Sequence, residues 1–373
     1  MKILIATPLY PPDDGGPATR ARILELALPP KGVDVEVVSF SHFRHLPKGV
    51  SHLFFLFALL RRASGADLLY ALDPVSVGLP ALIVATICRK PLALCIVGDY
   101  AWEQGVQRFG IKENLDQFTE NFQNKKKYSL PIYILRFIER TVAQHSRKII
   151  VPSAYLHSIV MRWGIDSKKI VIVYNSFLVD LPSETKDELK KYFATAHPTV
   201  ISVGRFVPWK GFTGLMDAMA LVRKSVPDAL LEIAGSGDDA EYRAYAKEKG
   251  YDFVRFLGLL DHSTLMRRIS AADCFALNTA YEGLSHVILE AMALRTPVVT
   301  TDVGGNPELF ASHARRWLAH YDEREHIASL IGLLLLDPAS AKETADASAD
   351  YVATFTEERM IAETITALND ALV

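Results

Sequence analysis

Short apolar runs alternate with longer stretches of helical periodicity along almost the whole chain. In the first half, the predicted strands cover residues 2–7, 33–39, 68–71, 92–97, 148–151 and 170–173. Strands that alternate with helices are typical of parallel sheets covered by helices on both faces. The pattern of the first half therefore predicts an α/β domain with a doubly wound parallel sheet.

The same alternation begins again after a polar, proline-containing segment that starts near Asn175. The predicted strands are 199–203, 230–234, 253–256, 274–277 and 296–300, and the helices between them include 211–224, 239–249 and 262–271. A chain of 373 residues is too long for one ordinary core. We expect two Rossmann-like domains, at residues 1–174 and 175–352, and a final helical segment at 353–373.

The composition of the chain limits which kinds of partner and which cellular location we expect for the protein. Apolar residues make up 50% of the chain and the formal net charge is −2, so bulk electrostatics does not favour nucleic acid as a partner. The three cysteines have neither metal-ligand nor disulfide spacing, which favours a reducing, cytoplasmic location. The first residues do not resemble a signal peptide, and the apolar run at 75–88 is interrupted by Pro80 before it reaches membrane-spanning length.

One carboxylate, Glu290, stands inside the apolar helix predicted at 287–294, which we expect to be buried on all sides. A buried carboxylate needs a partner. Glu282 lies eight positions earlier, which corresponds to about 12 Å along a helix. That separation suits the two ends of a nucleotide sugar, and the helix start between them offers N–H groups to a phosphate or a sugar. The alternative is that Glu290 pairs with a buried arginine and Glu282 is an ordinary loop residue.

Two cations follow the first strand of the second half. Arg205 and Lys210 stand five positions apart in a loop where they can converge on a diphosphate, although a solvated basic turn would look the same. The loop 235–240 also matches the loose dinucleotide fingerprint G-x-G-x-x-A. Asp238 and Asp239 would repel a pyrophosphate there, so we expect a tight turn instead.

Two loops of the first half are candidates for ligand contact. Gly15 and Gly16 follow the first strand, where a ligand can approach the backbone closely, and a flexible surface loop is the alternative. Asp99 follows another strand and is a candidate acceptor-binding residue or base. The alternative for Asp99 is that it caps the next helix.

Two apolar helices have basic neighbours. Lys125–Lys127 precede the apolar stretch 132–138, and Arg61 and Arg62 end the apolar stretch 53–60. This combination is found in helices that lie on anionic membranes, and also in ordinary core helices beside solvated lysines. Peripheral contact with the inner face of a membrane is therefore one of two interpretations.

With these motifs in place, the sequence resembles family 4 of the retaining glycosyltransferases, whose GT-B fold has two Rossmann-like domains facing a cleft. The resemblance covers nearly the whole chain. Its most specific part is the E-x7-E motif from Glu282 to Glu290. Gly204 and Arg205 with Lys210, and the pair Gly304–Gly305, also match, whereas Gly15–Gly16 match more loosely.

The resemblance implies a role for each matching residue. Glu290 would bind the ribose, Arg205 with Lys210 the diphosphate, and Glu282 the transferred sugar. The residues expected to complete the donor and acceptor sites are Gly15, Gly16, Gly204, Gly258, Leu259, Gly283, Leu284, Ser285 and His286. The final helix would return to pack on the first domain. Two departures from the family are Arg295, where glycine is common, and Asp99, where several members have histidine.

The implied reaction is transfer of a sugar, with retention, from a UDP- or GDP-linked donor to a hydroxyl group of a glycan or lipid-linked acceptor. No Asp-x-Asp pair occurs, which is consistent with the metal independence expected of this fold, and no cofactor is implied. One alternative is a nucleotide-sugar epimerase or hydrolase on the same fold. Another is a nucleotide-sugar-binding subunit without catalytic activity.

Overall fold

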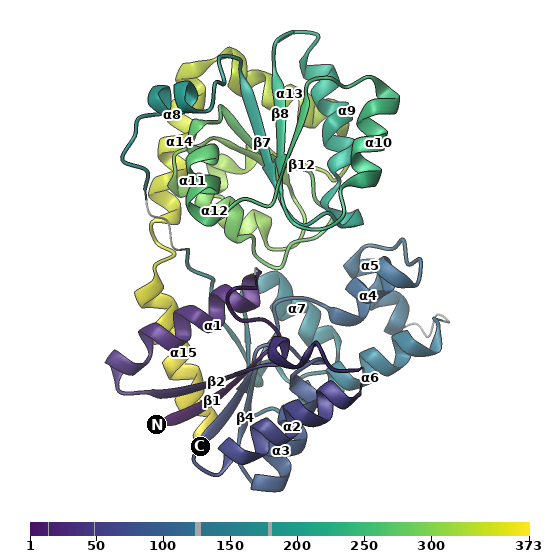
Figure 1. Ribbon diagram of the computed structural model, residues 1–373, viewed down its shortest axis with the longest axis vertical. Coiled ribbons are helices and arrows are strands. Elements are labelled where there is room, and N and C mark those ends of the chain that lie inside the picture. Colours follow the sequence, from purple (N-terminus) through teal and green to yellow (C-terminus); the bar gives the residue numbers. More distant parts are fainter. Residues whose placement is uncertain (14, 48, 124–127, 178–180) are drawn as a thin grey trace. The chain divides into compact units, whose positions relative to one another are not determined.

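The computed structural model describes residues 1–13, 15–47, 49–123, 128–177 and 181–373 (Figure 1). The basic patch predicted at 125–127 lies outside the described residues. The chain divides into two compact units: Met1–Asn175 together with Glu357–Val373 form unit 1, and Ser176–Thr356 form unit 2. Each unit has its own parallel sheet.

Unit 1 contains a six-stranded parallel sheet in the order β2-β1-β3-β4-β5-β6. The strands are β1 (Lys2–Thr7), β2 (Asp34–Ser39), β3 (Leu68–Ala71), β4 (Leu92–Cys95), β5 (Lys148–Val151) and β6 (Ile170–Ile172). β3, β4 and most of β1 and β5 are buried along their length. Strands that are buried on both faces are near-continuous apolar runs, so their positions could be predicted from the sequence.

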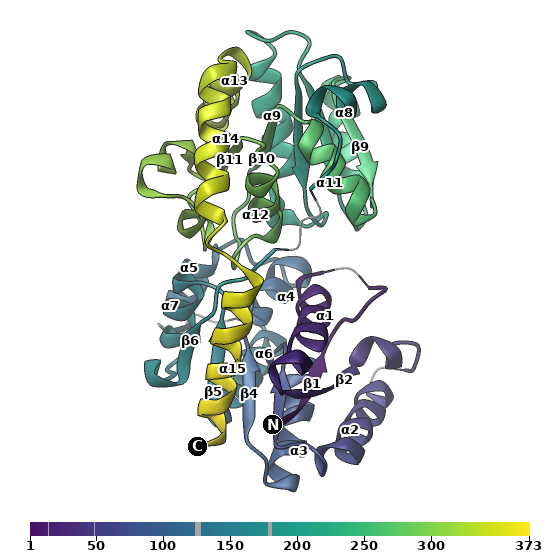
Figure 2. The same cartoon turned by 90° about the vertical axis from the view of Figure 1, so that its left-hand side faces the viewer.

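Helices cover both faces of this sheet (Figures 1 and 2). The order of the strands and right-handed crossovers put α1 (Gly16–Ala27) on one face, and α2 (Val50–Ala63), α3 (Gly78–Cys88), α6 (Leu130–His145) and α7 (Ala154–Arg162) on the other. Two further helices of the unit are α4 (Tyr100–Arg108) and α5 (Leu115–Gln123). The last helix of the chain, α15 (Glu357–Leu372), lies beside α1 and contacts β3, β4 and β5.

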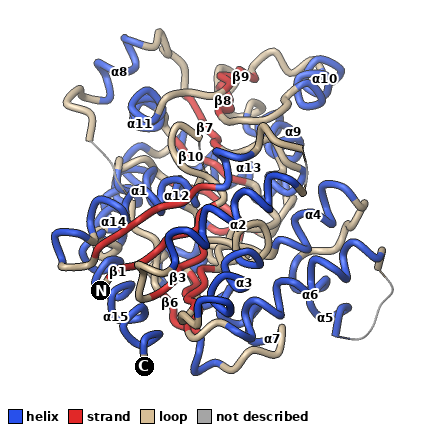
Figure 3. Tube along the Cα trace, turned by 60° about the horizontal axis from the view of Figure 1, so that its bottom comes forward, coloured by secondary structure: helices blue, strands red, loops and turns tan. Residues whose placement is uncertain are grey.

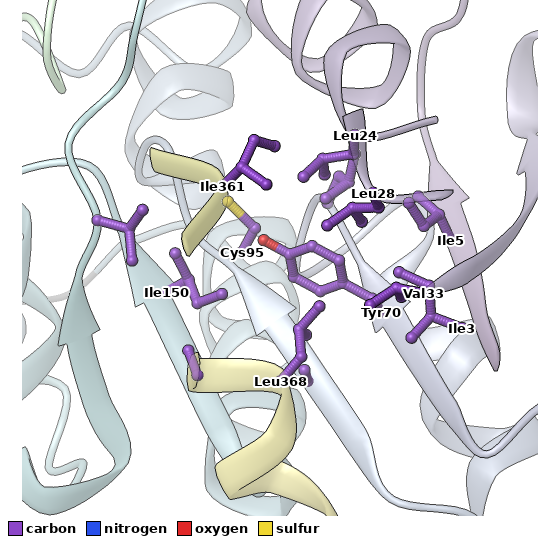
Figure 4. Close-up of a cluster of buried hydrophobic side chains, with 14 of the residues drawn as sticks. Ile3, Ile5, Leu24, Leu28, Val33, Tyr70, Cys95, Ile150, Ile361 and Leu368 are labelled. Carbon is purple, nitrogen blue, oxygen red and sulfur yellow. The ribbon is translucent and has the colours of Figure 1, made fainter. Parts of the chain in front are cut away.

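The core of unit 1 joins residues from opposite ends of the chain (Figure 4). Tyr70 and Cys95 from the sheet, Leu24 from α1, and Ile361 and Leu368 from α15 belong to one buried cluster. Apolar burial on this scale is the main favourable term in folding. The segment 357–373 is therefore an integral part of unit 1 although it follows unit 2 in the sequence.

Unit 2 contains a second six-stranded parallel sheet, in the order β12-β11-β10-β7-β8-β9. The strands are β7 (Thr199–Val203), β8 (Leu230–Ala234), β9 (Val254–Gly258), β10 (Cys274–Leu277), β11 (Val298–Thr301) and β12 (Leu318–Ala319). The helices are α8 (Lys186–Tyr192), α9 (Phe212–Val222), α10 (Ala240–Lys249), α11 (His262–Ala271), α12 (His286–Ala293), α13 (Arg324–Leu336) and α14 (Pro338–Val352). Figure 3 separates these helices from the strands along the trace.

The prediction of doubly wound α/β units is confirmed, and five of the predicted strands have shifted ends. The strands predicted at 33–39, 92–97, 170–173 and 253–256 are Asp34–Ser39, Leu92–Cys95, Ile170–Ile172 and Val254–Gly258. The strand predicted at 296–300 begins at Val298, because Arg295 and Thr296 form the turn that ends α12. Arg295 adopts a left-handed conformation with φ 57°. Glycine adopts this conformation with less strain than other residues do. The turn is therefore present with arginine at this position, at a higher cost in backbone strain than with glycine.

Candidate functional site

The loop after β7 in unit 2 is shaped by glycine and carries Lys210. The short 3₁₀ helix Pro208–Lys210 ends at Gly211, whose φ is 55°. A Cβ atom at Gly211 would lie 2.1 Å from the carbonyl oxygen of Asn278. Only glycine fits both the backbone conformation and this close approach, so the loop after β7 can lie directly against the loop after β10.

Residues just after β10 hydrogen-bond to the loop after β7 and so hold the two loops together. The amide of Asn278 donates to the carbonyl oxygen of Gly211 at 3.0 Å, and the backbone N–H of Ala280 donates to that of Trp209 at 2.7 Å. The hydroxyl of Thr279 also donates to the Trp209 carbonyl, at 3.1 Å. Both side chains are buried, so these hydrogen bonds fix the relative position of the loops.

The fastened loops bring together Lys210 and Glu282, which are 72 positions apart in the sequence. Their side chains form an ion pair and are 12% and 13% exposed. The backbone of Glu282 is held as well, because the N–H of Gly305 donates to its carbonyl oxygen at 3.0 Å. A Cβ atom at Gly304 would lie 2.0 Å from that oxygen, which explains the glycine there. From the sequence, Lys210 was expected to bind the diphosphate of a donor and Glu282 its sugar. In the structure the two side chains form an ion pair with each other.

Helix α12 has one partly exposed stripe, so the expectation that it is buried on all sides was wrong. Ile288, Leu289 and Met292 are buried, whereas His286 and Glu290 are half-buried and share the opposite face. A helix is buried only where neighbouring elements cover it, and an apolar sequence cannot show which side remains uncovered. Glu290 therefore lies at the boundary between core and surface.

The partner of Glu290 is a histidine and not a buried arginine. Nε2 of His262 lies 3.2 Å from Oε1 of Glu290, and the glutamate side chain is 15% exposed. His262 is the first residue of α11, after the capping residue Asp261, whose carboxylate accepts from the N–H of Thr264. Sequence reasoning missed His262, because nothing in its local sequence indicates a contact with a residue 28 positions away.

The remaining predicted residues of unit 2 lie in loops after the strands and around the start of α12. Ser285 is the N-cap of α12 and makes no side-chain capping hydrogen bond, and Gly283 and Leu284 are buried just before it. Arg205 is exposed, and its guanidinium carbon lies 6.0 Å from the ring centre of Trp209. Parallel strands end at one edge, so these loops lie at the same edge of the sheet as the Lys210–Glu282 pair.

The loop after β8 lies against Gly204, and the end of β9 lies against the loop after β8. The N–H of Gly204 donates to the carbonyl oxygen of Ala234, and the N–H of Gly235 donates to that of Gly258 at 2.9 Å. Gly258 has a φ of 68°, and Leu259 after it is exposed. The predicted base-binding positions therefore lie at the same edge of the sheet as Gly204.

Two predicted residues of unit 1, Gly15 and Gly16, begin α1. Gly15 is the N-cap, with φ 136°, and accepts through its carbonyl oxygen from the N–H of Ala18 at 2.9 Å. Both glycines are exposed. The strand–glycine–helix arrangement predicted after β1 is therefore present.

Asp99, also in unit 1, is fully buried as a helix cap. One carboxylate oxygen accepts from the N–H of Trp102 at 2.8 Å, and the other accepts from Nη2 of Arg136 at 2.6 Å. Arg136 also pairs with buried Glu139 at 3.2 Å. Burial, followed by the charge of Asp99, holds the pKa of Glu139 well above its usual range, although Arg136 opposes the shift. This placement agrees with the capping interpretation, because both carboxylate oxygens already have protein partners.

The described ranges contain neither a metal-binding cluster nor a membrane-spanning helix. No group of three or more His, Cys, Asp and Glu side chains there could hold a metal ion. Nor does any helix in those ranges combine the length and the apolar composition needed to cross a membrane.

Family models match both units. Residues 4–176 match the model "Glycosyl transferase 4-like domain", and residues 184–350 match "Glycosyl transferases group 1". The chain has the two domains of a GT-B glycosyltransferase. The Lys210–Glu282 pair of unit 2 lies within the second matched region.

Curated relatives match this chain over part of its length. A GDP-mannose-dependent monoacylated alpha-(1-6)-phosphatidylinositol monomannoside mannosyltransferase from Corynebacterium glutamicum is 32% identical over 184 residues, covering 47% of this chain and 46% of the relative. An alpha-maltose-1-phosphate synthase from Mycobacterium tuberculosis is 28% identical over 227 residues, covering 55% and 58%. The chain thus spans about half the length of the curated relatives it matches.

Solved structures share the fold of this chain over nearly its whole length. The sucrose-phosphate synthase of Thermosynechococcus elongatus superposes with a TM-score of 0.78 and 19% identity, covering 99% of this chain and 98% of that chain. The Anabaena protein HepE in complex with UDP-glucose gives a TM-score of 0.76 and 18% identity, covering 99% of both chains. At these identities the likeness shows the shared fold.

Proposed function

We propose that this chain transfers a sugar, with retention of anomeric configuration, from a nucleotide diphosphate sugar to a hydroxyl acceptor. The observation that carries the proposal is the Lys210–Glu282 ion pair at the carboxyl edge of the unit 2 sheet. Ligands of open α/β sheets bind at that edge. A lysine and a carboxylate held there can separate to receive the diphosphate and the sugar of one donor.

The charges at this edge fit the chemistry of the leaving group. As the glycosidic bond breaks, negative charge grows on the diphosphate and positive charge grows on the sugar ring. Lys210 and Arg205 would stabilise the negative charge that develops on the diphosphate. In many enzymes, preorganised charges of this kind account for the largest share of the acceleration over the uncatalysed reaction. Glu282 would accept hydrogen bonds from hydroxyl groups of the sugar, and Glu290 from those of the ribose. The contact between Glu290 and His262 keeps the Glu290 side chain at the surface of the unit.

The family 4 assignment, the E-x7-E roles and metal independence belong to this proposal. Two named neighbours support a nucleotide-sugar donor: the corynebacterial relative is GDP-mannose-dependent, and HepE was solved with UDP-glucose. The acceptor is proposed to be a glycan or a lipid-linked hydroxyl. We propose a structural role for Asp99, since a base must reach the acceptor and Asp99 is fully buried.

Replacing Lys210 tests the catalytic part of the proposal. We expect Lys210→Ala to lower turnover by roughly 100-fold or more, because removing one preorganised contact to a developing charge has effects of this size. The matched control is Lys190→Ala. Lys190 pairs with Asp273 at 2.7 Å at the amino end of β10, at the opposite edge of the same sheet. Turnover by Lys210→Ala at the level of Lys190→Ala would contradict the role of Lys210.

The two alternatives give different products. A transferase forms the glycoside only when an acceptor is present, whereas a hydrolase or epimerase converts the donor alone. A binding subunit would bind the donor and convert it under neither condition. Incubating donor with and without an acceptor panel and separating the products distinguishes the three.

A further inference from the structure

The outer faces of three neighbouring helices in unit 1 are unusually apolar. Ten of the 21 large apolar side chains that are exposed in the described residues belong to α2, α3 and α6. On α2 they are Val50, Leu53, Phe54 and Phe57, which follow helical spacing and form one stripe. The stripe is opposite the face by which Phe55 and Leu59 are buried in the unit.

Helix α6 repeats the arrangement. Leu130, Tyr133, Ile134 and Phe137 form an exposed stripe, with Leu130 and Phe137 about 70% exposed. Helix α3 contacts both of the other two. It adds Ile83 and Ile87 to the exposed apolar set. The three helices therefore present adjacent apolar surface, larger in extent than the scattered exposed side chains of an ordinary monomer.

The exposed charged side chains on these helices are all basic. The exposed charged side chains are Arg61 and Arg62 at the end of α2 and Arg140 on α6. The only acidic residue in the three helices is Glu139, which is fully buried and paired with Arg136. Elsewhere, Glu36 of β2 pairs with Arg62 at 2.8 Å. Apart from this pair, the exposed charges of the three helices are basic, and an apolar surface with basic groups is complementary to an anionic partner.

We propose that the outer face of α2, α3 and α6 docks onto a membrane that contains anionic lipids. Aromatic and aliphatic side chains would enter the boundary between headgroups and acyl chains, while the arginines contact the headgroup phosphates. A second copy fits less well, because twofold pairing of this face would offer Arg61 and Arg140 no exposed carboxylate on the same helices of the other copy. This inference goes beyond the proposed function, since it concerns binding and not sugar transfer.

Vesicle flotation tests the docking face. The full chain is mixed with vesicles of equal parts phosphatidylglycerol and phosphatidylcholine, or of phosphatidylcholine alone. We expect binding to the anionic vesicles, weaker binding to the neutral ones, and release by salt. Phe54→Ser combined with Phe57→Ser should weaken binding to anionic vesicles roughly tenfold or more. The matched control is Leu333→Ser with Leu336→Ser on α13 of unit 2, which removes two side chains that are also more than half exposed.

The outcomes separate the proposal from its alternatives. Failure of the wild-type chain to float with anionic vesicles, or equal binding by the Phe54/Phe57 variant and the control, would overturn it. So would concentration-dependent dimerisation that the Phe54/Phe57 variant abolishes, because the face would then bind a second copy. If that variant unfolds, the double variant Arg61→Gln with Arg140→Gln replaces it. This variant removes two positive charges from the face and should also weaken binding to anionic vesicles. Nucleotide binding should be unchanged in all of them, so docking and the proposed function can fail separately.

Discussion

At the scale of single residues, the candidate site depends on glycines that allow two backbones to meet. Gly211 contacts the loop of Asn278, and Gly304 contacts the carbonyl of Glu282. Neither contact involves a catalytic side chain, yet both determine where Lys210 and Glu282 lie. The sequence showed the glycines as turn residues and could not show which backbone each would meet, because the partner lies far away in the chain.

Gly304→Ala should be more destabilising than an ordinary glycine substitution. Its φ is 61° and a Cβ atom would lie 2.0 Å from the carbonyl oxygen of Glu282, so the new methyl group forces the loops apart. We expect a loss of about 2–4 kcal/mol in the free energy of unfolding. Gly250→Ala is the control, since Gly250 has a φ of 69° and no neighbour within 4 Å, and should cost about 1 kcal/mol. Denaturant unfolding of both variants measures the difference, and equal losses would show that the contact with Glu282 is unimportant.

The limits of sequence reasoning are clearest at this scale. Glu290 was recognised as an acid that needs a partner, but that partner is His262 and not an arginine. The acid and the base of the Lys210–Glu282 pair were both singled out, yet their pairing could not be predicted, because it depends on hydrogen bonds of Asn278 and Thr279 to a loop about 70 positions earlier. The helix-capping role of Asp99 was one of two local interpretations, and only the position of Arg136 distinguishes them.

At the scale of secondary-structure elements, the strands were the most predictable part. The strands β7, β8 and β10 begin and end at the predicted residues, because each is a largely apolar run that is followed by glycine or a polar residue. Helix α12 was harder, since its apolar sequence predicts burial and not the direction from which neighbours cover it. Its partly exposed stripe became visible only in the packed unit.

Helix α8 is tied to the sheet of unit 2 by an ion pair network whose strength should depend on pH. Asp273 accepts from Nζ of Lys190 at 2.7 Å and from the N–H of Thr199 at 2.9 Å, and lies 3.1 Å from Nζ of Lys186. Burial raises the pKa of Asp273, but the two lysines and the Thr199 N–H outweigh it and hold the pKa below its usual value. A depressed carboxyl pKa adds stability above the pKa of the unfolded chain, and this contribution disappears as pH falls through the lower folded value.

Asp273→Asn should therefore destabilise the protein at neutral pH and have a shrinking effect in acid. We expect the difference in unfolding free energy between wild type and variant to be constant near neutrality and to decrease below about pH 4. Denaturant unfolding across this range measures it. A difference that stays constant, or grows, as the pH falls would show that the charge of Asp273 is not what ties α8 to the sheet.

At the scale of the whole molecule, the sequence predicted two α/β units because the alternation of strands and helices is interrupted once, near Asn175. The two sheets confirm that fold class, and the family models match one unit each. Other features of the whole chain needed the structure. The exposed stripes of α2 and α6 have the same residue types as buried helices, and only their exposure shows that they are available to a partner.

The central claim is that Lys210 at the carboxyl edge of unit 2 binds the diphosphate of a nucleotide donor, and calorimetric titration with UDP and GDP tests it most directly. The account predicts that at least one of them binds the wild-type chain, binds Lys210→Ala roughly tenfold to 100-fold more weakly because a charge-assisted contact is lost, and binds Lys190→Ala as it binds wild type. Binding of neither nucleotide, or equal binding by wild type and Lys210→Ala, would contradict it.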